Sequence, residues 1–284
     1  MGWDVRDKTI LITGTTSGIG LEASLALARR GARVVMVGRD RARTEAAVAK
    51  VRAGSGSTEI THLLCDFSSL AAVRELAGAA HARCPRLDVL VNNAGGVSKV
   101  RRLTENGIER TFAVNHLAPF LLTNLLVDRI VQSAPARIVT VASIGHRRGT
   151  LDFDDLGYAR GYGIMRAYTR SKLANVLFAA ELARRLAGTG VTSNSVHPGP
   201  VDTNIWSGAP IWAKPIIQLV FRPFFIPAEK GASYLVNLAA RADLADVTGK
   251  YFEGNRMVDP SAAAQEVGLA KRLWDVSAAM AGLA

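Results

Sequence analysis

Near its start the chain carries Lys8-Thr9-Ile10-Leu11-Ile12-Thr13-Gly14-Thr15-Thr16-Ser17-Gly18-Ile19-Gly20, and its architecture follows from this segment. The first six of these residues form a short apolar run of the kind that makes a buried parallel strand. A glycine-rich turn follows at once, and a helical pattern then continues to Arg30. Gly14 permits a tight turn, whereas Gly18 and Gly20 let backbone N–H groups and the helix N-terminus approach a pyrophosphate. Strand, glycine turn and helix in this order predict a dinucleotide-binding unit.

The alternation of apolar runs and helical patterns continues along the chain. Further strands are predicted at residues 33–37, 60–65, 88–91, 137–142, 191–196 and 250–252. Helices are predicted at about 69–83, 115–126, 167–186 and 228–239, and the strand at 250–252 is expected to close the domain. Strands that alternate with crossover helices make a parallel sheet with helices on both faces. We therefore predict an α/β fold, a single doubly wound domain over residues 1–284 with a mostly seven-stranded parallel sheet.

Length and composition narrow the class of protein. The chain has 284 residues, of which 49% are hydrophobic, and this suffices for a substantial core. Only two cysteines occur, Cys65 and Cys84, and their spacing does not suit a metal site. Residues 1–6 lack the apolar run of a signal peptide. We therefore expect a soluble, cytoplasmic protein without a bound metal.

The formal net charge of +11, from 35 Lys+Arg against 24 Asp+Glu, favours anionic partners such as nucleic acid, phospholipid surfaces or phosphorylated cofactors. The basic residues are scattered in pairs, such as Arg29-Arg30 and Arg184-Arg185, without interleaved aromatic residues. Solvated faces explain most of these pairs, and no nucleic-acid motif accompanies them. We therefore do not expect nucleic acid to be a partner.

The end of the second predicted strand indicates which cofactor the unit prefers. A site that prefers NAD usually places Asp or Glu here to bind the ribose hydroxyls, and this chain has Gly38. Arg39, Arg41 and Arg43 follow, near a helix N-terminus where the helix dipole does not favour cations. A 2′-phosphate suits a guanidinium group, so we expect Arg39, helped by Arg43, to favour NADP(H) over NAD(H). The alternative is a solvated basic turn.

Tyr168 and Lys172 lie four residues apart in the predicted helix at 167–186, so their side chains project from one face. A free phenol has a pKa of about 10, and bringing it near 7 requires roughly 4 kcal/mol of support for the phenolate. An ammonium at about 5 Å supplies roughly 3 kcal/mol of this at an effective dielectric of about 20. The pair is therefore a candidate acid–base group. The alternative is a Tyr and a Lys that simply cover a helix surface.

Small and polar residues follow three more predicted strands. Asp66 ends the third strand, where its carboxylate can accept a hydrogen bond from an adenine amino group. Asn92-Asn93-Ala94-Gly95 follows the fourth strand and allows close approach of a cofactor to the backbone. Ser143 ends the fifth strand. In doubly wound sheets, ligands bind at these carboxyl ends, so we expect the residues to share one site.

Together these features resemble the short-chain dehydrogenase/reductase family over essentially the whole chain, and this implies a Rossmann-type domain. The residues that carry the resemblance are Thr13-Gly14 through Gly20, Asp66, Asn92 through Gly95, Asn115, Ser143, Tyr168, Lys172 and Pro198-Gly199. Residues 171–178, 181–186 and 196–199 are similar to the retinol-dehydrogenase-like branch. Two departures stand out. Many relatives in that branch carry an N-terminal membrane anchor before the first strand, and some NADP-binding relatives have a basic residue where this chain has Ser17.

The resemblance implies a role for each matched residue. Tyr168 is the implied general acid/base, Ser143 donates to the reacting oxygen, and Lys172 lowers the phenol pKa and holds the nicotinamide ribose. Asn115 is implied to anchor a water molecule that relays the proton to solvent. The implied cofactor-binding residues are Gly14, Thr16, Ser17, Gly18, Ile19, Gly20, Arg39, Asp66, Phe67, Asn93, Ala94, Gly95, Tyr168, Lys172, Pro198, Gly199, Val201 and Thr203. His146 and His197 are assigned no catalytic role.

The leading hypothesis is an NADP(H)-dependent oxidoreductase that interconverts an apolar alcohol and its aldehyde or ketone, with a retinoid-, steroid- or lipid-aldehyde-like substrate. The rival hypothesis is an NADP-binding sensor or scaffold without turnover. The presence of Tyr168 argues against it, because cofactor binding alone does not require this tyrosine. Residues 204–227, rich in Pro and Trp, predict a mobile lid over an apolar substrate pocket, with ordinary core packing as the alternative. Contact of this lid with a membrane surface, association into homo-oligomers and the preferred direction of reaction stay open.

Overall fold

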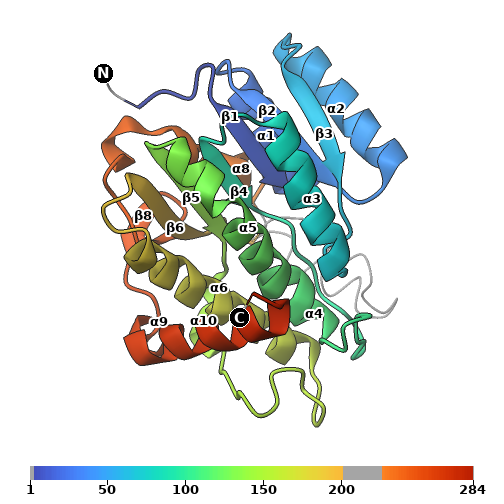
Figure 1. The fold of residues 1–284 in the computed structure, drawn as a ribbon, viewed down its shortest axis with the longest axis vertical. Coiled ribbons are helices and arrows are strands. Elements are labelled where there is room, and N and C mark those ends of the chain that lie inside the picture. Colours follow the sequence, from blue (N-terminus) through green and yellow to red (C-terminus); the bar gives the residue numbers. More distant parts are fainter. Residues whose placement is uncertain (1–2, 201–225, 284) are drawn as a thin grey trace.

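The computed structural model describes residues 3–200 and 226–283. Its strands form one eight-stranded sheet in the order β3-β2-β1-β4-β5-β6-β7-β8 (Figure 1). The strands are β1 Thr9–Thr13, β2 Arg33–Gly38, β3 Ile60–Leu64, β4 Val89–Asn92, β5 Ala136–Val141, β6 Val191–His197, β7 Tyr251–Glu253 and β8 Arg256–Val258. The first seven pair in parallel, as the sequence predicts, and β8 is an additional strand antiparallel to β7. The doubly wound α/β fold is confirmed.

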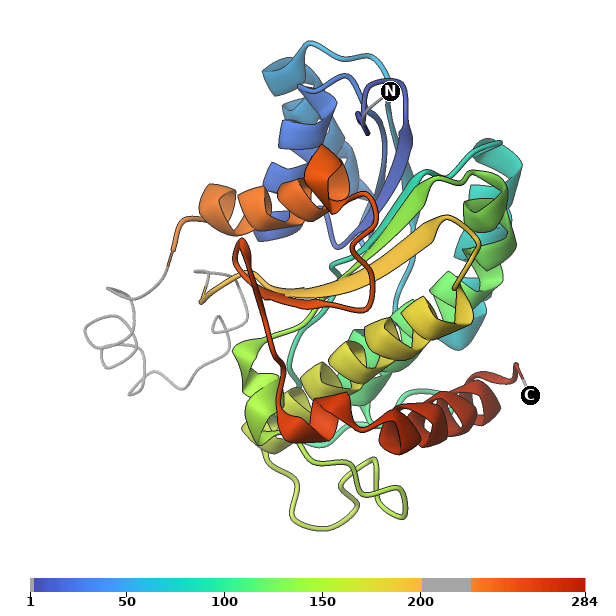
Figure 2. The same ribbon diagram turned by 90° about the vertical axis from the view of Figure 1, so that its left-hand side faces the viewer.

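Helices cover both faces of the sheet (Figure 2). One face carries α1 (Gly18–Ala28), α2 (Arg41–Ser55) and α8 (Ala228–Ala240). The other carries α3 (Leu70–Arg83), α5 (Ala118–Gln132) and α6 (Ile164–Arg185), and α10 (Val267–Ala281) packs outside α6. Short helical segments complete the described chain: α4 (Arg110–Phe112), η1 (Ala113–Leu117), η2 (Ile144–Arg148), η6 (Ala242–Leu244) and α9 (Ala262–Gln265). Among the described helices, none is long and apolar enough to cross a bilayer.

The strands supply both cores because successive side chains of a strand point to opposite faces. In β2, Val34 and Met36 belong to the core under α1, α2 and α8. Val35 and Val37 belong to the core under α3, α5 and α6. All four are nearly inaccessible to solvent. Burial on both faces explains why these strands appear in the sequence as continuous apolar runs rather than as alternating patterns.

Local signals set the limits of the helices. Asp40 caps α2, and its carboxylate accepts a hydrogen bond from the Arg43 N–H at 2.9 Å. Gly56, at φ 71°, ends the same helix in the left-handed conformation that glycine adopts without strain. Ser69 caps α3 by accepting from the Ala72 N–H. The expected helix starts near 41 and 69 are therefore fixed by side-chain caps.

The end of the chain differs from the prediction. The strand β7 does not close the domain, because β8, α9 and α10 follow it. The predicted helix near 115–126 is also divided: α4 and the π-helical segment η1 precede α5. The proposed lid at 204–227 lies outside the described residues except for Ile226 and Pro227. Val201 and Thr203 lie outside them as well.

The order of the strands creates the site. Strand β1 pairs in parallel with β2 on one side and with β4 on the other. The chain therefore winds outward in opposite directions from β1, and the connections leave a crevice at the carboxyl ends of these two central strands.

Candidate active site

The glycine turn after β1 packs closely against the loop that follows β4. Gly14 adopts φ 72°, and a Cβ atom there would lie 2.8 Å from the Cα atom of Ala94. The side-chain amide of Asn93 donates to the carbonyl oxygens of Thr13 (2.8 Å) and Gly14 (3.1 Å). A Cβ atom on Gly20 would collide with the carbonyl oxygen of Gly14. These contacts leave an open turn at the N-terminus of α1, where the first N–H groups have no intrahelical partner.

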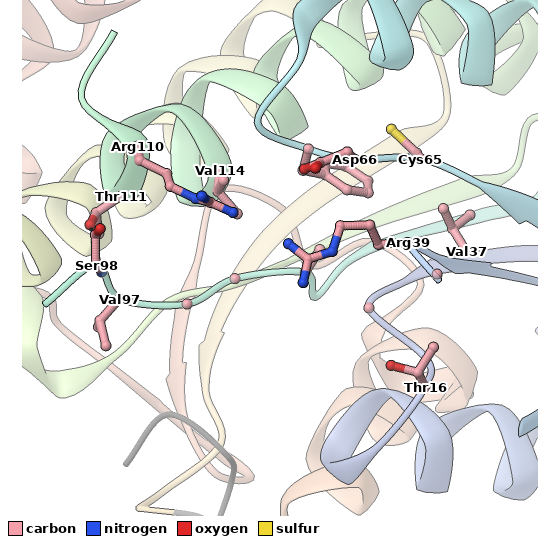
Figure 3. Close-up of a pocket in the computed structure, with 16 residues that line it drawn as sticks. Thr16, Val37, Arg39, Cys65, Asp66, Val97, Ser98, Arg110, Thr111 and Val114 are labelled. Carbon is pink, nitrogen blue, oxygen red and sulfur yellow. Dashed lines mark hydrogen bonds between the residues drawn. The ribbon is translucent and has the colours of Figure 1, made fainter. Parts of the chain in front are cut away.

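A cleft of about 320 Å³ lies beside this turn, at the carboxyl ends of β1 to β4. Seven predicted cofactor residues line it: Gly14, Thr16, Arg39, Asp66, Phe67, Ala94 and Gly95. Figure 3 shows Arg39 and Arg110 reaching into this space from opposite sides, with Asp66 above Arg39. Arg110 and Val114 were not predicted to line the cleft. Their spacing of four residues at the start of a helical region is the signal that places them on one face.

The charges in the cleft suit an adenosine phosphate. Arg39 is exposed, and within the described residues its guanidinium takes part in no ion pair, whereas Arg41 pairs with Glu45 at 3.6 Å. Desolvation alone would raise the pKa of Asp66. Hydrogen bonds from Ser68, with Arg39 and Arg110 nearby, outweigh it and hold that pKa below its usual range. Asp66 is therefore an anionic acceptor beside two cations.

Packing explains why residue 38 is a glycine, and the sequence alone does not show this. A Cβ atom at this position would collide with Thr44 Oγ1 and lie 2.7 Å from Thr16 Cγ2. The absence of a carboxylate at the end of β2 is thus enforced by the helix packed behind it. An exchange of Gly38 for Asp would disturb α2 as well as the cofactor pocket, so specificity is better tested at Arg39.

The predicted catalytic side chains meet at the carboxyl end of β5. Tyr168 and Lys172 lie on α6, and the Lys172 Nζ is 5.7 Å from the centre of the Tyr168 ring. Ser143 follows β5 and begins η2. A Cβ atom built on Gly145 would lie 3.4 Å from Ser143 Oγ and 3.6 Å from Tyr168 Cε1, so these two side chains flank one small space. Gly145 keeps that space open.

Burial changes the acid–base chemistry of the pair. Desolvation raises the pKa of the Tyr168 phenol, and the Ser143 hydroxyl offsets only part of this rise. Desolvation also lowers the pKa of Lys172 to about 8. The sequence argument predicts a lowered phenol pKa because it counts the ammonium and leaves out desolvation. The half-buried phenol is therefore held in its protonated form.

Hydrogen bonds fix three of the four catalytic candidates. Lys172 Nζ donates to the Val141 carbonyl at 2.9 Å. Ser143 Oγ accepts from the Gly145 N–H at 3.1 Å, which leaves the serine proton available to an oxygen beside Tyr168. The Asn115 side chain accepts from Gly96 N–H and donates to the Gly96 carbonyl and to Ser171 Oγ. Since both amide protons of Asn115 are engaged, a relaying water would have to donate to a carbonyl oxygen of this residue.

The remaining predicted residues lie around the same edge. Ser17 is exposed and precedes α1, and Gly18 and Ile19 form its first turn. Pro198 is buried and Gly199 has φ 87°. Both follow β6. The Ile226 N–H donates to the carbonyl oxygen of Pro200, the residue after Gly199, at 2.8 Å. His146 contacts the Ser143 carbonyl, and His197 lies near His146 and Lys172; neither histidine lines the cleft.

Comparisons with known proteins agree with this geometry. A family model described as short chain dehydrogenase matches residues 8–213. The chain is 40% identical to retinol dehydrogenase 13 of Homo sapiens, covering 98% of this chain and 86% of the relative. It is 42% identical to retinol dehydrogenase 14 of Homo sapiens, covering 98% and 88%. A solved structure of an uncharacterized protein from Mycobacterium paratuberculosis has a TM-score of 0.78 at 31% identity, covering 99% of this chain and 98% of the other.

Proposed function

Because this chain belongs to the short chain dehydrogenase family, we propose that it is an NADP(H)-dependent oxidoreductase that interconverts an apolar alcohol and its aldehyde or ketone. The observation that carries this proposal is the convergence of Ser143, Tyr168 and Lys172 next to the cleft that Arg39 and Asp66 line. A Cβ atom on Gly95, which lines that cleft, would lie 3.8 Å from Lys172 Nζ. A bound nicotinamide cofactor supplies the hydride chemistry, and the chain supplies orientation and proton transfer.

In the proposed reduction, Tyr168 donates its proton to the carbonyl oxygen of the substrate. Its protonated ground state suits this role, because desolvation disfavours the phenolate before substrate arrives. Ser143 donates a hydrogen bond to the same oxygen and stabilises the charge that develops there. The Lys172 ammonium stabilises the phenolate that remains, and its hydrogen bond to Val141 holds it in place.

Arg39 supports the preference for NADP(H). It reaches into the adenosine end of the cleft and forms no ion pair with any carboxylate among the described residues (Figure 3). A guanidinium in this position matches a 2′-phosphate. The end of β2 has no room for the acidic side chain that an NAD-preferring site uses on the ribose hydroxyls.

Apolar side chains beside the catalytic pair support an apolar substrate. Ile144 follows Ser143 directly and is 50% exposed. Met165, one turn before Tyr168 on α6, is 51% exposed. A substrate that covers these side chains gains up to about 0.8 kcal/mol for each buried CH₂ group. The names of the retinol dehydrogenase relatives agree with such a substrate.

A homologous series of aldehydes tests the proposal. Steady-state kinetics with NADPH should show kcat/KM rising with chain length and then levelling off, and NADH should be the poorer cofactor. Ile144→Ser and Met165→Ser should flatten the rise without changing NADPH affinity, and Met257→Ser, exposed on β8, is the matched control. A parental protein that binds NADPH but reduces no member of the series would favour the sensor hypothesis instead.

A further inference from the structure

His146 is a fully buried histidine three residues after Ser143, and both of its ring nitrogens have partners. The Nδ1 atom lies 2.8 Å from the carbonyl oxygen of Ser143. The Nε2 atom lies 3.0 Å from the backbone nitrogen of Ser261, in the segment after β8. The imidazole therefore connects the catalytic serine to a part of the chain more than a hundred residues away.

These partners determine the protonation of the ring. A carbonyl oxygen can only accept, so Nδ1 must carry the proton. A backbone N–H can only donate, so Nε2 must present a lone pair to Ser261. The ring is thus neutral, with its proton on Nδ1. Tyr251 packs against it edge-on, with ring centres 4.6 Å apart, and limits its rotation.

His146 donates two hydrogen bonds to the backbone of Ser143. Its carbonyl oxygen accepts from the backbone N–H of His146 at 3.0 Å and from the imidazole Nδ1 at 2.8 Å. The Ser143 hydroxyl is held from the other side by the Gly145 N–H. The direction of the Ser143 hydroxyl thus depends on the turn that His146 closes.

We propose that His146 is a positioning residue for Ser143, and that the N–H of Ser261 selects the tautomer in which it acts. This inference rests on the proposed function, because it assigns Ser143 the role of donor to the reacting oxygen. It extends the site to the segment after β8, which lies beyond the residues that the family model matches.

The charges around the ring bear on its protonation. Arg147, which pairs with Glu253 at 3.1 Å, is the next residue, while Glu253 and Tyr251 face the ring from β7. His197 on β6 lies near His146, and Lys172 on α6 lies near His197. Desolvation lowers the pKa of His146, and Arg147 adds to this, whereas the Ser143 carbonyl and Glu253 oppose it. Protonation at Nε2 would turn a donor toward the Ser261 N–H and break the connection.

Two substitutions at residue 261 distinguish the role of the backbone N–H from that of the side-chain hydroxyl. Ser261 has φ −61°, close to the value that proline requires, so Ser261→Pro fits the backbone but replaces the N–H with a ring carbon that displaces the imidazole from this contact. Ser261→Ala keeps the N–H and removes only a hydroxyl that is buried without a hydrogen-bond partner among the described residues. With NADPH and the best aldehyde, Ser261→Ala should match the parental protein. Ser261→Pro should lower kcat about tenfold, the effect of one lost hydrogen bond, with NADPH affinity unchanged.

The pH profile and the imidazole nitrogen spectrum separate positioning from a merely structural role. In Ser261→Pro, proton uptake at Nε2 no longer costs a hydrogen bond, so the acid limb of the kcat profile should move to higher pH by about one unit. In ¹⁵N-histidine spectra, the parental protein should show His146 protonated at Nδ1 only, and Ser261→Pro should show the doubly protonated ring appearing at higher pH than in the parental protein. Parental kcat and pH profile in Ser261→Pro, or a parental His146 protonated at Nε2, would overturn the proposal.

A second pair of variants covers the case in which Ser261→Pro does not fold. The amide of His146→Asn can still donate to the Ser143 carbonyl in place of Nδ1, whereas His146→Leu cannot. We expect His146→Asn to retain about tenfold more kcat than His146→Leu, with equal NADPH affinity. Equal losses in the two variants would contradict the positioning role. If the parental protein turns over no carbonyl, the proposed function fails, and the parental nitrogen spectrum still decides the tautomer.

Discussion

At Tyr168, burial and charge act in opposite directions. Desolvation raises the pKa of the phenol, and the ammonium of Lys172 stands 5.7 Å from the ring centre to stabilise the phenolate once it forms. A partly desolvated acid of this kind holds its proton until a substrate oxygen takes it. The phenol is thus suited to proton donation in a reduction.

Replacing Tyr168 with Phe removes that proton and little else. Tyr168→Phe should lower kcat by about 10²–10⁴-fold, the usual contribution of a positioned acid. NADPH affinity, measured by titration of the protein's fluorescence, should change little. A phenylalanine variant that reduces its best aldehyde at near-parental rate would exclude Tyr168 as the acid.

Arg39 is expected to carry the cofactor preference. Arg39→Ala should lower kcat/KM with NADPH by about 10–100-fold, since it removes hydrogen bonds between a cation and a phosphate, and should leave the value with NADH nearly unchanged. Arg43→Ala, four residues further along the chain and also exposed, is the matched control; Arg43 does not line the cleft, so its loss should have a much smaller effect. The ratio of the two efficiencies is the quantity to measure. A parental ratio that already favours NADH contradicts this assignment.

At the residue scale, the sequence predicted the side chains that stand at strand ends or in a helical pair. It missed the side chains that only the folded chain brings into the cleft or into contact with one another. Arg39, Asp66, Ser143 and Tyr168 were visible because each stands at a strand end or in a helical pair. Arg110 was not, because it stands apart from any strand end and only folding turns it into the cleft. The link from His146 to Ser261 joins positions 115 residues apart, and no local pattern indicates it.

At the element scale, the parallel strands were predictable, whereas the C-terminal elements were not. Strands β1, β2, β4 and β5 are buried on both faces and so form nearly continuous apolar runs. Strand β8 has only three residues, and two of them are exposed. Helix α10 begins at Val267, and Glu266 before it provides no side-chain cap, so its start carries no signature. Its stability therefore comes from packing, chiefly against α6.

Trp274 is the aromatic anchor of α10. Its ring lies 4.9 Å from that of Phe120 on α5 and 5.9 Å from that of Phe178 on α6, and the guanidinium of Arg185 covers it at 4.2 Å. Trp274→Ala should lower the free energy of unfolding by about 2–4 kcal/mol, measured by denaturant titration. Val267→Ala, 45% exposed on the same helix, should change it by less than about 0.5 kcal/mol. Equal effects would mean that α10 is not anchored through Trp274.

At the scale of the whole molecule, topology explains why the site could be placed before the structure was known. Strands that run in parallel bring their carboxyl ends to one edge, so residues far apart in sequence meet there. The sequence thus predicted that Gly14, Asp66, Gly95 and Ser143 share a site. Desolvation depends on the completed fold, and for that reason the direction of the Tyr168 pKa shift was predicted wrongly.

Burial of Lys172 also has a consequence for the stability of the whole protein. Its pKa falls from 10.5 to about 8, so between these values the unfolded chain binds a proton that the native state does not. The free energy of unfolding gains a contribution that rises with pH across this window. Below it, the buried ammonium costs up to about 3 kcal/mol, at about 1.4 kcal/mol per pKa unit.

Lys172→Met should therefore raise the free energy of unfolding at about pH 7 by about 1–3 kcal/mol while abolishing turnover. The Val141 carbonyl keeps a hydrogen bond from Asn175 at 3.1 Å, so no acceptor is left unpaired. The gain should shrink as the pH rises toward 10.5, the ordinary pKa of lysine. Denaturant titrations of both proteins across this range provide the measurement. A gain that does not depend on pH would show that Lys172 is not the group that titrates.

The most direct test of the central claim follows the hydride itself. The purified protein is incubated with NADPH deuterated at the transferable position of the nicotinamide and with a long-chain or retinoid aldehyde, and the product is examined by mass spectrometry. We predict an alcohol that carries one deuterium on the former carbonyl carbon, formed by the parental protein and at least about 10²-fold more slowly by Tyr168→Phe. A protein that binds NADPH yet yields no labelled alcohol from any of these aldehydes, or a Tyr168→Phe variant that labels it as fast, would contradict the account.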